Sequence, residues 1–132
     1  ALVFIDLDHL KQVNDQHGHG AGDRLLVSIA QTMARALRAD DVLGRMGGEE
    51  FAAVLPGVSP TEAQAIAERV RSAVERQALD ATQSGPQRAT VSIGLVHSAT
   101  LGADADMDTL LPAADTALYR AKAEGRNRVM VG

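Results

Sequence analysis

Two adjacent carboxylates, Glu49 and Glu50, directly follow a pair of glycines in this 132-residue chain. The segment Gly47-Gly48-Glu49-Glu50-Phe51 lies between apolar runs, a pattern typical of a β-hairpin with a Gly-Gly tip. Glycines let a backbone approach a bulky anionic ligand, and neighbouring carboxylates can hold the divalent cation that such a ligand carries. A hairpin with a solvated acidic tip explains the same residues equally well, so the hairpin alone leaves both interpretations open.

A second acidic segment favours the ligand site. Residues 2–5 form a short apolar run typical of a buried strand, and this run ends in Asp6-Leu7-Asp8. Carboxylates at the end of a strand, beside a hairpin that delivers two more, indicate a two-metal phosphoryl-transfer site. Asp6 and Glu49 would suffice, because Mg²⁺ needs only one or two protein carboxylates when phosphates supply further ligands. Helix capping is the alternative function for Asp6. For Asp8, which precedes an expected helix, helix capping explains the residue as well as a role in the ligand site does.

Composition limits the class of protein. With 45% hydrophobic and 23% charged residues, the chain is expected to form one globular domain with a sizeable core. A formal net charge of −4, with two Phe, one Tyr and no Trp, argues against a nucleic-acid partner. The chain has no cysteine, which excludes disulfides and Cys-ligated metals. No apolar stretch approaches the roughly 20 residues that a membrane span needs.

Apolar periodicity predicts the elements that position the carboxylates. A capping box at Ser59–Glu62 and an N-cap at Asp108 mark two helix starts, and Gly125 marks a helix end. The expected order β-α-α-β-β-α-β-α-β gives an α/β sandwich. Its predicted elements are a strand over 2–5, a helix from 10, a helix over 23–38, the hairpin, a helix over 60–77, a loop over 81–87, a strand over 89–95, a helix over 108–125 and a strand over 129–131.

These motifs, in this order, resemble the GGDEF domain of the diguanylate cyclase family, with glutamate at the third position of the signature. The resemblance runs from residue 1 to residue 131 and implies the nucleotidyl-cyclase palm fold. In that fold a mostly antiparallel central sheet is flanked by helices, and the GGEEF motif lies on a β-hairpin. The resemblance rests on residues 4–11 with Asn14-Asp15, on Gly18-His19 with Gly22-Asp23, and on residues 45–51, 91–94 and 114–127.

The chain departs from the family pattern in two places. Leu10 stands where an aromatic residue usually precedes the lysine, and the family's upstream helix with its D-x-L-T and N-R-R motifs is not in this sequence. Residues 1–132 are therefore expected to be a single GGDEF domain truncated at its N-terminus. The parent chain is expected to carry an upstream sensor or signalling domain.

The resemblance implies a cytoplasmic enzyme, free or tethered to a membrane-bound sensor. The family condenses two GTP molecules into cyclic di-GMP with release of pyrophosphate, and its cofactor is Mg²⁺ or Mn²⁺. Each GTP is held by one domain, so catalysis requires a homodimer of GGDEF domains. A non-catalytic signalling domain that binds cyclic di-GMP or GTP is the alternative, although degenerate domains of that kind usually lose signature residues.

The resemblance also implies a role for individual residues. Asp6, the carbonyl group of Leu7 and Glu49 match the metal ligands, and Glu49 with Glu50 matches the catalytic acidic pair. The identity of the general base is left open. Asn14 and Asp23 match the residues that read guanine, although Asp23 alone is also a good helix cap. The remaining expected substrate contacts are Lys11, Gly47, Gly48, Lys122 and Arg126.

Lys122 and Arg126 are expected four residues apart on one helix face, where two like charges are mildly unfavourable unless an anion bridges them. Without the family context, a solvated basic helix end would explain them. An inhibitory site is implied by Arg38 and Asp41, which form an R-x-x-D motif with five residues between Asp41 and Gly47. Arg69 matches the family's secondary arginine. A planar guanidinium suits both guanine edges and phosphates, so this site would bind the product cyclic di-GMP.

Overall fold

The computed structural model describes residues 1–78, 89–102 and 104–132. The predicted order of elements is confirmed, with one short helix, α4, added between β4 and α5. The loop predicted over 81–87 lies outside the described residues. In chain order the elements are β1 (Leu2–Leu7), α1 (Leu10–His17), α2 (His19–Ala36), β2 (Val42–Gly47), β3 (Glu50–Val54), α3 (Pro60–Ala78), β4 (Val91–Val96), α4 (Ser98–Leu101), α5 (Met107–Ala123) and β5 (Arg128–Val131).

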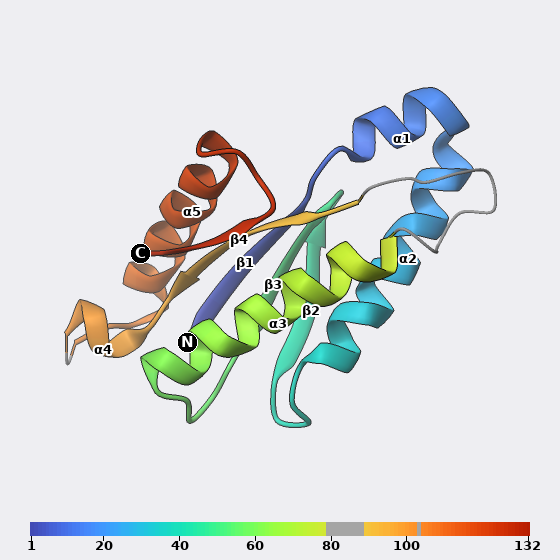
Figure 1. Cartoon of the computed structure of the whole chain (residues 1–132). Coiled ribbons are helices and arrows are strands. Elements are labelled where there is room, and N and C mark those ends of the chain that lie inside the picture. The colour runs from blue at the N-terminus through green and yellow to red at the C-terminus, as the bar shows by residue number, and fades with distance from the viewer. Residues whose placement is uncertain (79–88, 103) are drawn as a thin grey trace.

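The five strands form one sheet in the order β2-β3-β1-β4-β5 (Figure 1). All neighbours pair antiparallel except β4 and β5, which are parallel. Every residue of β1 and of β4 is buried. Because successive side chains of a strand point to opposite faces, these two strands need cover on both sides of the sheet. The predicted mostly antiparallel sheet is therefore confirmed, with β1 at its centre.

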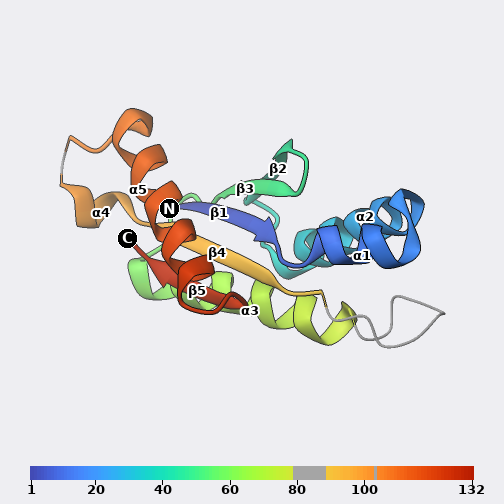
Figure 2. The ribbon, with the colours of Figure 1, turned by 90° about the horizontal axis from the view of Figure 1, so that it is seen from above.

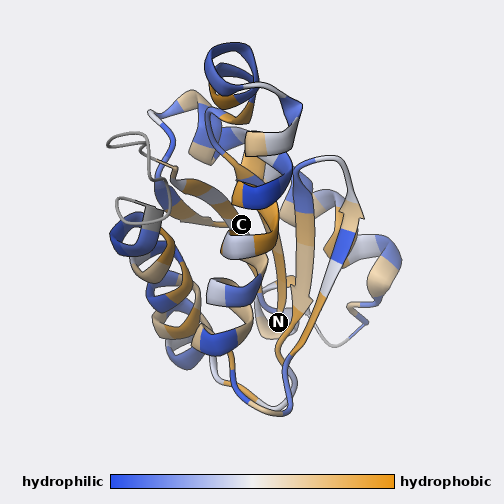
Figure 3. Cartoon of the chain, turned by 90° about the vertical axis from the view of Figure 1, so that its right-hand side faces the viewer, coloured by the Kyte–Doolittle hydropathy of each residue, from blue (hydrophilic) through white to orange (hydrophobic). Residues whose placement is uncertain are grey.

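Helices supply that cover on each face. The apolar sides of α2 and α3 share a core with Val3, Ile5 and Leu7 of β1, whereas Leu2 and Phe4 pack with α5. Figure 2 shows α5 and α3 on opposite sides of β4. In Figure 3 the strands are mostly hydrophobic, and the helices alternate between hydrophobic and hydrophilic residues. This layering confirms the predicted α/β sandwich.

A close approach between α5 and the sheet depends on Gly94 in β4. A Cβ atom at this position would lie 2.3 Å from the backbone nitrogen of Leu118 and 2.4 Å from the carbonyl oxygen of Ala114. No real Cβ makes such contacts, so any larger residue would push α5 away from β4. Gly94 thereby fixes the height of α5 above the sheet, and with it the position of the end of α5.

The predicted starts of two helices are wrong. Helix α2 begins at His19 and not at Asp23, because Gly18, at φ 85°, already redirects the chain after α1. Asp23 therefore lies inside α2 and does not cap it. Helix α5 is capped by Asp106, whose carboxylate accepts from the Thr109 backbone while the Thr109 hydroxyl accepts in return. This reciprocal box sets the start of the helix, so Asp108 lies in its first turn.

Candidate active site

The end of β1 and the turn of the β2–β3 hairpin meet, as predicted. Asp6 pairs in register with Glu50, and the Leu7 backbone nitrogen donates to the carbonyl oxygen of Glu49 over 3.1 Å. The hairpin turn itself is braced by Arg45, whose Nε and Nη2 donate to the carbonyl oxygen of Gly48 at 2.9 and 2.6 Å. The carboxylates of two segments more than 40 residues apart are thus brought to one edge of the sheet.

A cleft of about 360 Å³ opens at this edge. It brings together acidic residues from β1 and the hairpin with basic residues from α1 and the end of α5. Six of the predicted site residues line it. The complete lining is Asp6, Leu7, Asp8, His9, Leu10, Lys11, Gln12, Glu49, Lys122 and Arg126.

Asp6 is the most buried charged group of the cleft, with 2% of its surface exposed. Its Oδ2 forms an ion pair with the Lys122 Nζ, whereas its Oδ1 is buried and has no hydrogen-bond partner among the described residues. A buried acceptor without a partner costs about 1–3 kcal/mol. The Asp6 carboxylate is therefore only half satisfied by the protein and can accept a further positive group.

Glu49 is subject to a related imbalance. Burial raises the pKa of its carboxyl group, and the negative charge of Asp6 raises it further, while Lys122 opposes the shift. A raised pKa means that the ionised form is disfavoured in this position. A cation beside Glu49 and Asp6 would reverse this effect, because an opposite charge nearby favours the ionised carboxylate.

The donor set fits a hard divalent cation. The described residues contain no group of three His, Cys, Asp or Glu side chains that could hold a metal ion by themselves. Asp6 and Glu49 supply two carboxylates, and Leu7, which also lines the cleft, has a backbone carbonyl group that could serve as a further oxygen ligand. Such oxygen-only sets suit Mg²⁺ or Mn²⁺ when substrate phosphates complete the coordination. The unpartnered Oδ1 of Asp6 is the feature of this structure that supports the fit.

The basic residues line the same cleft, but their arrangement differs from the predicted one. Helix α5 ends at Ala123, so Arg126 lies in the following turn, at φ 64°, and does not share a helix face with Lys122. Both residues nevertheless line the cleft, and so does the exposed Lys11 from α1. Lys122 and Arg126 therefore meet at the cleft because of the turn after α5, and not because they are four residues apart on a helix.

The two residues expected to read guanine lie on α1 and α2. Asn14 of α1 has a buried Oδ1 without a hydrogen-bond partner in the described part of the chain. This atom fills the space where a Cβ of Gly22 would be, since such a Cβ would lie only 1.8 Å from it. Asp23 follows Gly22 on α2 and is exposed. Neither Asn14 nor Asp23 belongs to the lining of the 360 Å³ cleft.

Glu50, Gly47 and Gly48 are exposed at the hairpin and also lie outside that lining. A Cβ at either glycine would meet no atom within 4 Å, so the space next to the turn is open to a ligand. The structure thus gives Glu49 and Glu50 different surroundings. Only Glu49 shares the cleft with Asp6.

The expected inhibitory residues also come together. The Arg38 Nε donates to both carboxylate oxygens of Asp41, at 3.1 and 3.2 Å, and the Arg38 Nη2 donates to the Asp41 Oδ1 at 2.6 Å. The Arg38 backbone nitrogen adds a bond of 2.8 Å to the same carboxylate. The Nη2 of Arg38 also donates to the carbonyl oxygen of Pro56. Arg69 donates from Nε to the carbonyl oxygen of Ala36 over 2.7 Å, two residues before Arg38.

The two groups of residues are far apart in the molecule. Asp41 directly precedes Val42, which lies level with Val54 and with Leu2 at the start of β1, whereas Asp6 lies at the end of β1. An inhibitory ligand at Arg38 would therefore not occupy the 360 Å³ cleft.

Sequence analysis missed one group of residues near the cleft. Asp8 does not cap α1, because His9 occupies the N-cap position and makes no side-chain cap bond. The Asp8 carboxylate instead accepts from Thr90, Ser92 and the backbone of Asn127. The available signal was Thr90 and Ser92 themselves, two hydroxyls at the start of an otherwise apolar strand.

Comparison with known proteins identifies the family. Residues 1–128 match the family described as "Diguanylate cyclase, GGDEF domain". The chain belongs to this GGDEF family.

The chain is similar to the probable diguanylate cyclase DgcT of Escherichia coli, with 40% identity over 98% of this chain and 28% of DgcT. Among solved structures it resembles diguanylate cyclase SiaD from Pseudomonas aeruginosa, in complex with its activator SiaC. Here the TM-score is 0.88 and the identity 37%, over 99% of this chain and 49% of SiaD. A second similar structure is the GGDEF domain of DgcB from Caulobacter crescentus in complex with c-di-GMP. Its TM-score is 0.88 and its identity 31%, over 98% of this chain and 75% of the DgcB chain.

Proposed function

We propose that this chain is the catalytic domain of a diguanylate cyclase that condenses two GTP molecules into cyclic di-GMP. The observation that carries the proposal is the composition of the cleft: Asp6 keeps one unpartnered oxygen beside its ion pair with Lys122, burial raises the pKa of Glu49, and Arg126 lines the same cleft. This is the charge pattern that a metal-bound triphosphate would complete. Membership of the GGDEF family supports the same reaction.

Asp6, the carbonyl group of Leu7 and Glu49 would hold Mg²⁺ or Mn²⁺. Bound there, the cation would neutralise charge on the phosphates during phosphoryl transfer. Lys11, Lys122 and Arg126 would bind the phosphate oxygens, and Asn14 with Asp23 would bind the guanine edge. Gly47 and Gly48 would leave room for the nucleotide at the hairpin, and Glu50 would lie beside the attacking hydroxyl.

The reaction requires two chains. The 3′-hydroxyl oxygen of one GTP bonds to the α-phosphorus of the other, the bond to the β-phosphate oxygen breaks, and pyrophosphate leaves. The step then repeats in the opposite direction and closes the ring. Because one cleft holds one nucleotide, two copies of the domain must face each other, and positioning supplies most of the catalysis.

Product inhibition is the second part of the proposal. Arg38, Asp41 and Arg69 would bind cyclic di-GMP at the other end of the molecule, through the planar guanidinium groups. The structure of DgcB in complex with c-di-GMP supports the idea that this family of domains binds its product. The proposed partners are therefore GTP, cyclic di-GMP and a second copy of the domain.

The setting of the domain is also proposed. In the described residues no helix is both long enough and apolar enough to cross a membrane. We infer a cytoplasmic domain, where GTP is available, controlled by a sensor or signalling domain in the parent chain. The structure of SiaD in complex with its activator SiaC supports the idea that a domain of this kind is controlled by another protein unit.

The test is to incubate the full-length protein with GTP and Mg²⁺ and to measure cyclic di-GMP and pyrophosphate. Glu49→Gln should lower the rate by about 100-fold or more, since it removes a charge that acts on the transferring phosphate. Glu62→Gln, an exposed glutamate on α3, is the matched control and should leave the rate unchanged. Formation of product by Glu49→Gln at the normal rate would contradict the assignment.

Added cyclic di-GMP distinguishes the cyclase from the alternative, a non-catalytic signalling domain. The cyclase should be inhibited by its product, and Arg38→Ala and Arg69→Ala should each weaken that inhibition without abolishing the basal rate. A folded, dimeric protein that binds cyclic di-GMP through Arg38 but forms no product from GTP would be the signalling domain instead.

A further inference from the structure

Asp8 is the most fully hydrogen-bonded carboxylate beside the cleft. It is 3% exposed, and its Oδ1 accepts from the Ser92 hydroxyl over 2.7 Å. Its Oδ2 accepts from the Thr90 hydroxyl over 2.8 Å and from the Asn127 backbone nitrogen over 3.1 Å. Asp6, two residues earlier, has one ion pair and an unpartnered oxygen. Two aspartates of one strand end thus have opposite surroundings, which indicates different functions.

The third of these contacts reaches the turn that carries Arg126. Arg126 and Asn127 both have positive φ angles, 64° and 47°. Residues other than glycine rarely adopt this conformation because it is sterically unfavourable, so the turn needs support from other parts of the chain. The Arg126 backbone nitrogen bonds to the carbonyl oxygen of Ala121, and the next backbone nitrogen, that of Asn127, donates to Asp8.

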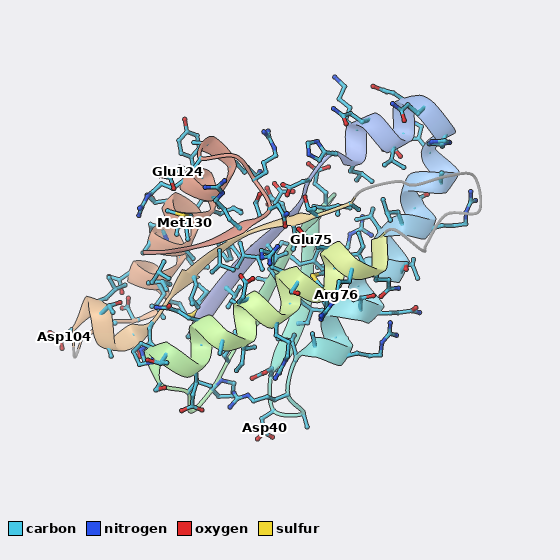
Figure 4. All side chains as sticks on the ribbon, viewed as in Figure 1. Asp40, Glu75, Arg76, Asp104, Glu124 and Met130 are labelled. Atoms are coloured by element: carbon cyan, nitrogen blue, oxygen red, sulfur yellow. The ribbon has the colours of Figure 1, made fainter. Side chains whose placement is uncertain are left out.

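Helix α3 holds the other side of the turn. The Arg71 Nη1 donates to the Asn127 Oδ1 over 2.8 Å, and the Asn127 side-chain amide donates to the Glu75 carboxylate. Arg71 is itself paired with Glu68 and Glu75 along α3, the helix that bears the label Glu75 in Figure 4. The turn is therefore clamped between the end of β1 and one face of α3.

We infer that Asp8 is a positioning residue: it fixes the strained turn after α5 so that the Arg126 guanidinium meets the nucleotide phosphates. This inference rests on the proposed function, which supplies the nucleotide. Asp8 acts through Arg126, while Asp6 and Glu49 are left to hold the cation. The competing role is that of a third metal-binding carboxylate, because Asp8 also borders the cleft.

Hydrogen-bond chemistry separates the two roles. Asparagine at position 8 can keep all three contacts: its Oδ1 accepts from Thr90 and Asn127, and its Nδ2 donates to the Ser92 hydroxyl, which can also accept. Alanine keeps none of them. A positioning residue therefore tolerates Asp8→Asn and not Asp8→Ala, whereas a metal ligand tolerates neither.

The experiment measures KM for GTP and kcat in the full-length protein for Asp8→Ala, Asp8→Asn, Arg126→Ala and the double variant Asp8→Ala/Arg126→Ala. Asp8→Ala should raise KM about tenfold and Asp8→Asn at most about threefold. In the Arg126→Ala background, Asp8→Ala should change KM by less than about twofold, because its route to the phosphates is already gone. Independent, multiplicative effects of the two substitutions would overturn the inference. Asp6→Asn is measured alongside as the metal-ligand reference, and a fall in kcat/KM in Asp8→Asn as large as that in Asp6→Asn would also overturn the inference.

Amide hydrogen exchange at Asn127 gives a readout that needs no activity. Exchange should accelerate at least about tenfold in Asp8→Ala and remain near wild type in Asp8→Asn and in the exposed control Asp40→Asn. Unchanged exchange in Asp8→Ala would overturn the inference.

If Asp8→Ala does not fold, Asp8→Asn combined with Ser92→Ala replaces it. Here the asparagine Nδ2 loses its acceptor, and KM should rise above that of Asp8→Asn alone. An unchanged KM would count against the inference. A wild-type protein that neither binds nor converts GTP would overturn the proposed function instead, and the exchange measurement would still decide the contact between Asp8 and Asn127.

Discussion

The cleft at the end of β1 and the Arg38–Asp41 pair after α2 both contain buried carboxylates, but their charges are balanced in opposite ways. Asp41 has a fully buried side chain that accepts four hydrogen bonds from Arg38. These bonds hold the pKa of Asp41 below its usual value of 3.8. In the cleft, burial and a neighbouring carboxylate instead raise the pKa of Glu49, and Asp6 keeps an unpartnered oxygen.

This difference indicates how each region would meet a ligand. The Arg38–Asp41 pair is complete within the chain, so its geometry is set before any ligand arrives, and its charge adds to the stability of the fold. In the cleft, the negative charges of Asp6 and Glu49 repel each other, and a bound cation would reduce this repulsion. Functional sites are often left in such a state, and the cost is borne by the rest of the fold.

The largest effect should come from breaking the satisfied pair. Asp41→Asn weakens the bonds that Arg38 donates and leaves a half-buried guanidinium without its counter-charge. We expect the free energy of unfolding to fall by about 2–3 kcal/mol. Urea denaturation measures this loss, and Asp40→Asn, the exposed neighbour, should change stability by less than about 0.5 kcal/mol. Equal effects of the two substitutions would contradict the comparison.

Cation binding should produce the next largest effect, and only in the cleft. Mg²⁺ at ten times its dissociation constant should stabilise the fold by about 1.4 kcal/mol, since it binds the folded state alone. Melting temperature followed against Mg²⁺ concentration measures this gain. The gain should disappear in Glu49→Gln and persist in Asp41→Asn. Stabilisation that survives Glu49→Gln would place the cation elsewhere.

A smaller effect should have the opposite sign from the first. In the absence of metal, Glu49→Gln removes a disfavoured charge and keeps the shape of the side chain. The fold should therefore gain about 0.5 kcal/mol, a size typical of changes outside the core. Glu50→Gln is the matched control at the exposed neighbouring position. A loss of stability in Glu49→Gln would show that the Glu49 charge is already compensated by the protein.

Much of this contrast could be predicted from the sequence, because apolar strands and glycine turns are local patterns that determine how neighbouring segments pair. The apolar strands expected over 2–5 and 89–95, together with the Gly-Gly hairpin, predicted the sheet that brings Asp6 to Glu49. The family resemblance placed Arg38 and Asp41 in one expected site, whereas the ion pair between their side chains is seen only in the structure.

Other features depend on contacts that no local pattern encodes. The position of Arg126 is set by the positive φ angles of Arg126 and Asn127. It is also set by the hydrogen bond from the Asn127 backbone to Asp8, a residue near the other end of the chain. Sequence periodicity extended α5 too far and gave Arg126 a helical position. Likewise, Asp8 has the residue type and place of a helix cap, and its hydrogen bonds to Thr90 and Ser92 become visible only when β4 lies beside β1.

The smallest and most diagnostic effect should be the pH dependence of stability. Glu49 has a folded-state pKa above its usual 4.5, so between these two values the unfolded chain has lost a proton that the folded chain retains. Stability should therefore fall as pH rises through that window, and Glu49→Gln should remove this part of the slope. Asp41 acts in the opposite direction: its contribution is complete above pH 3.8 and is lost as pH falls through its lowered folded-state pKa. Chemical denaturation of wild type and both variants from about pH 3 to pH 7 without metal separates the two. The stability gained by Glu49→Gln should grow with rising pH, and the stability lost in Asp41→Asn should shrink at the acidic end. Parallel pH profiles for all three proteins would mean that the two regions do not differ in charge balance.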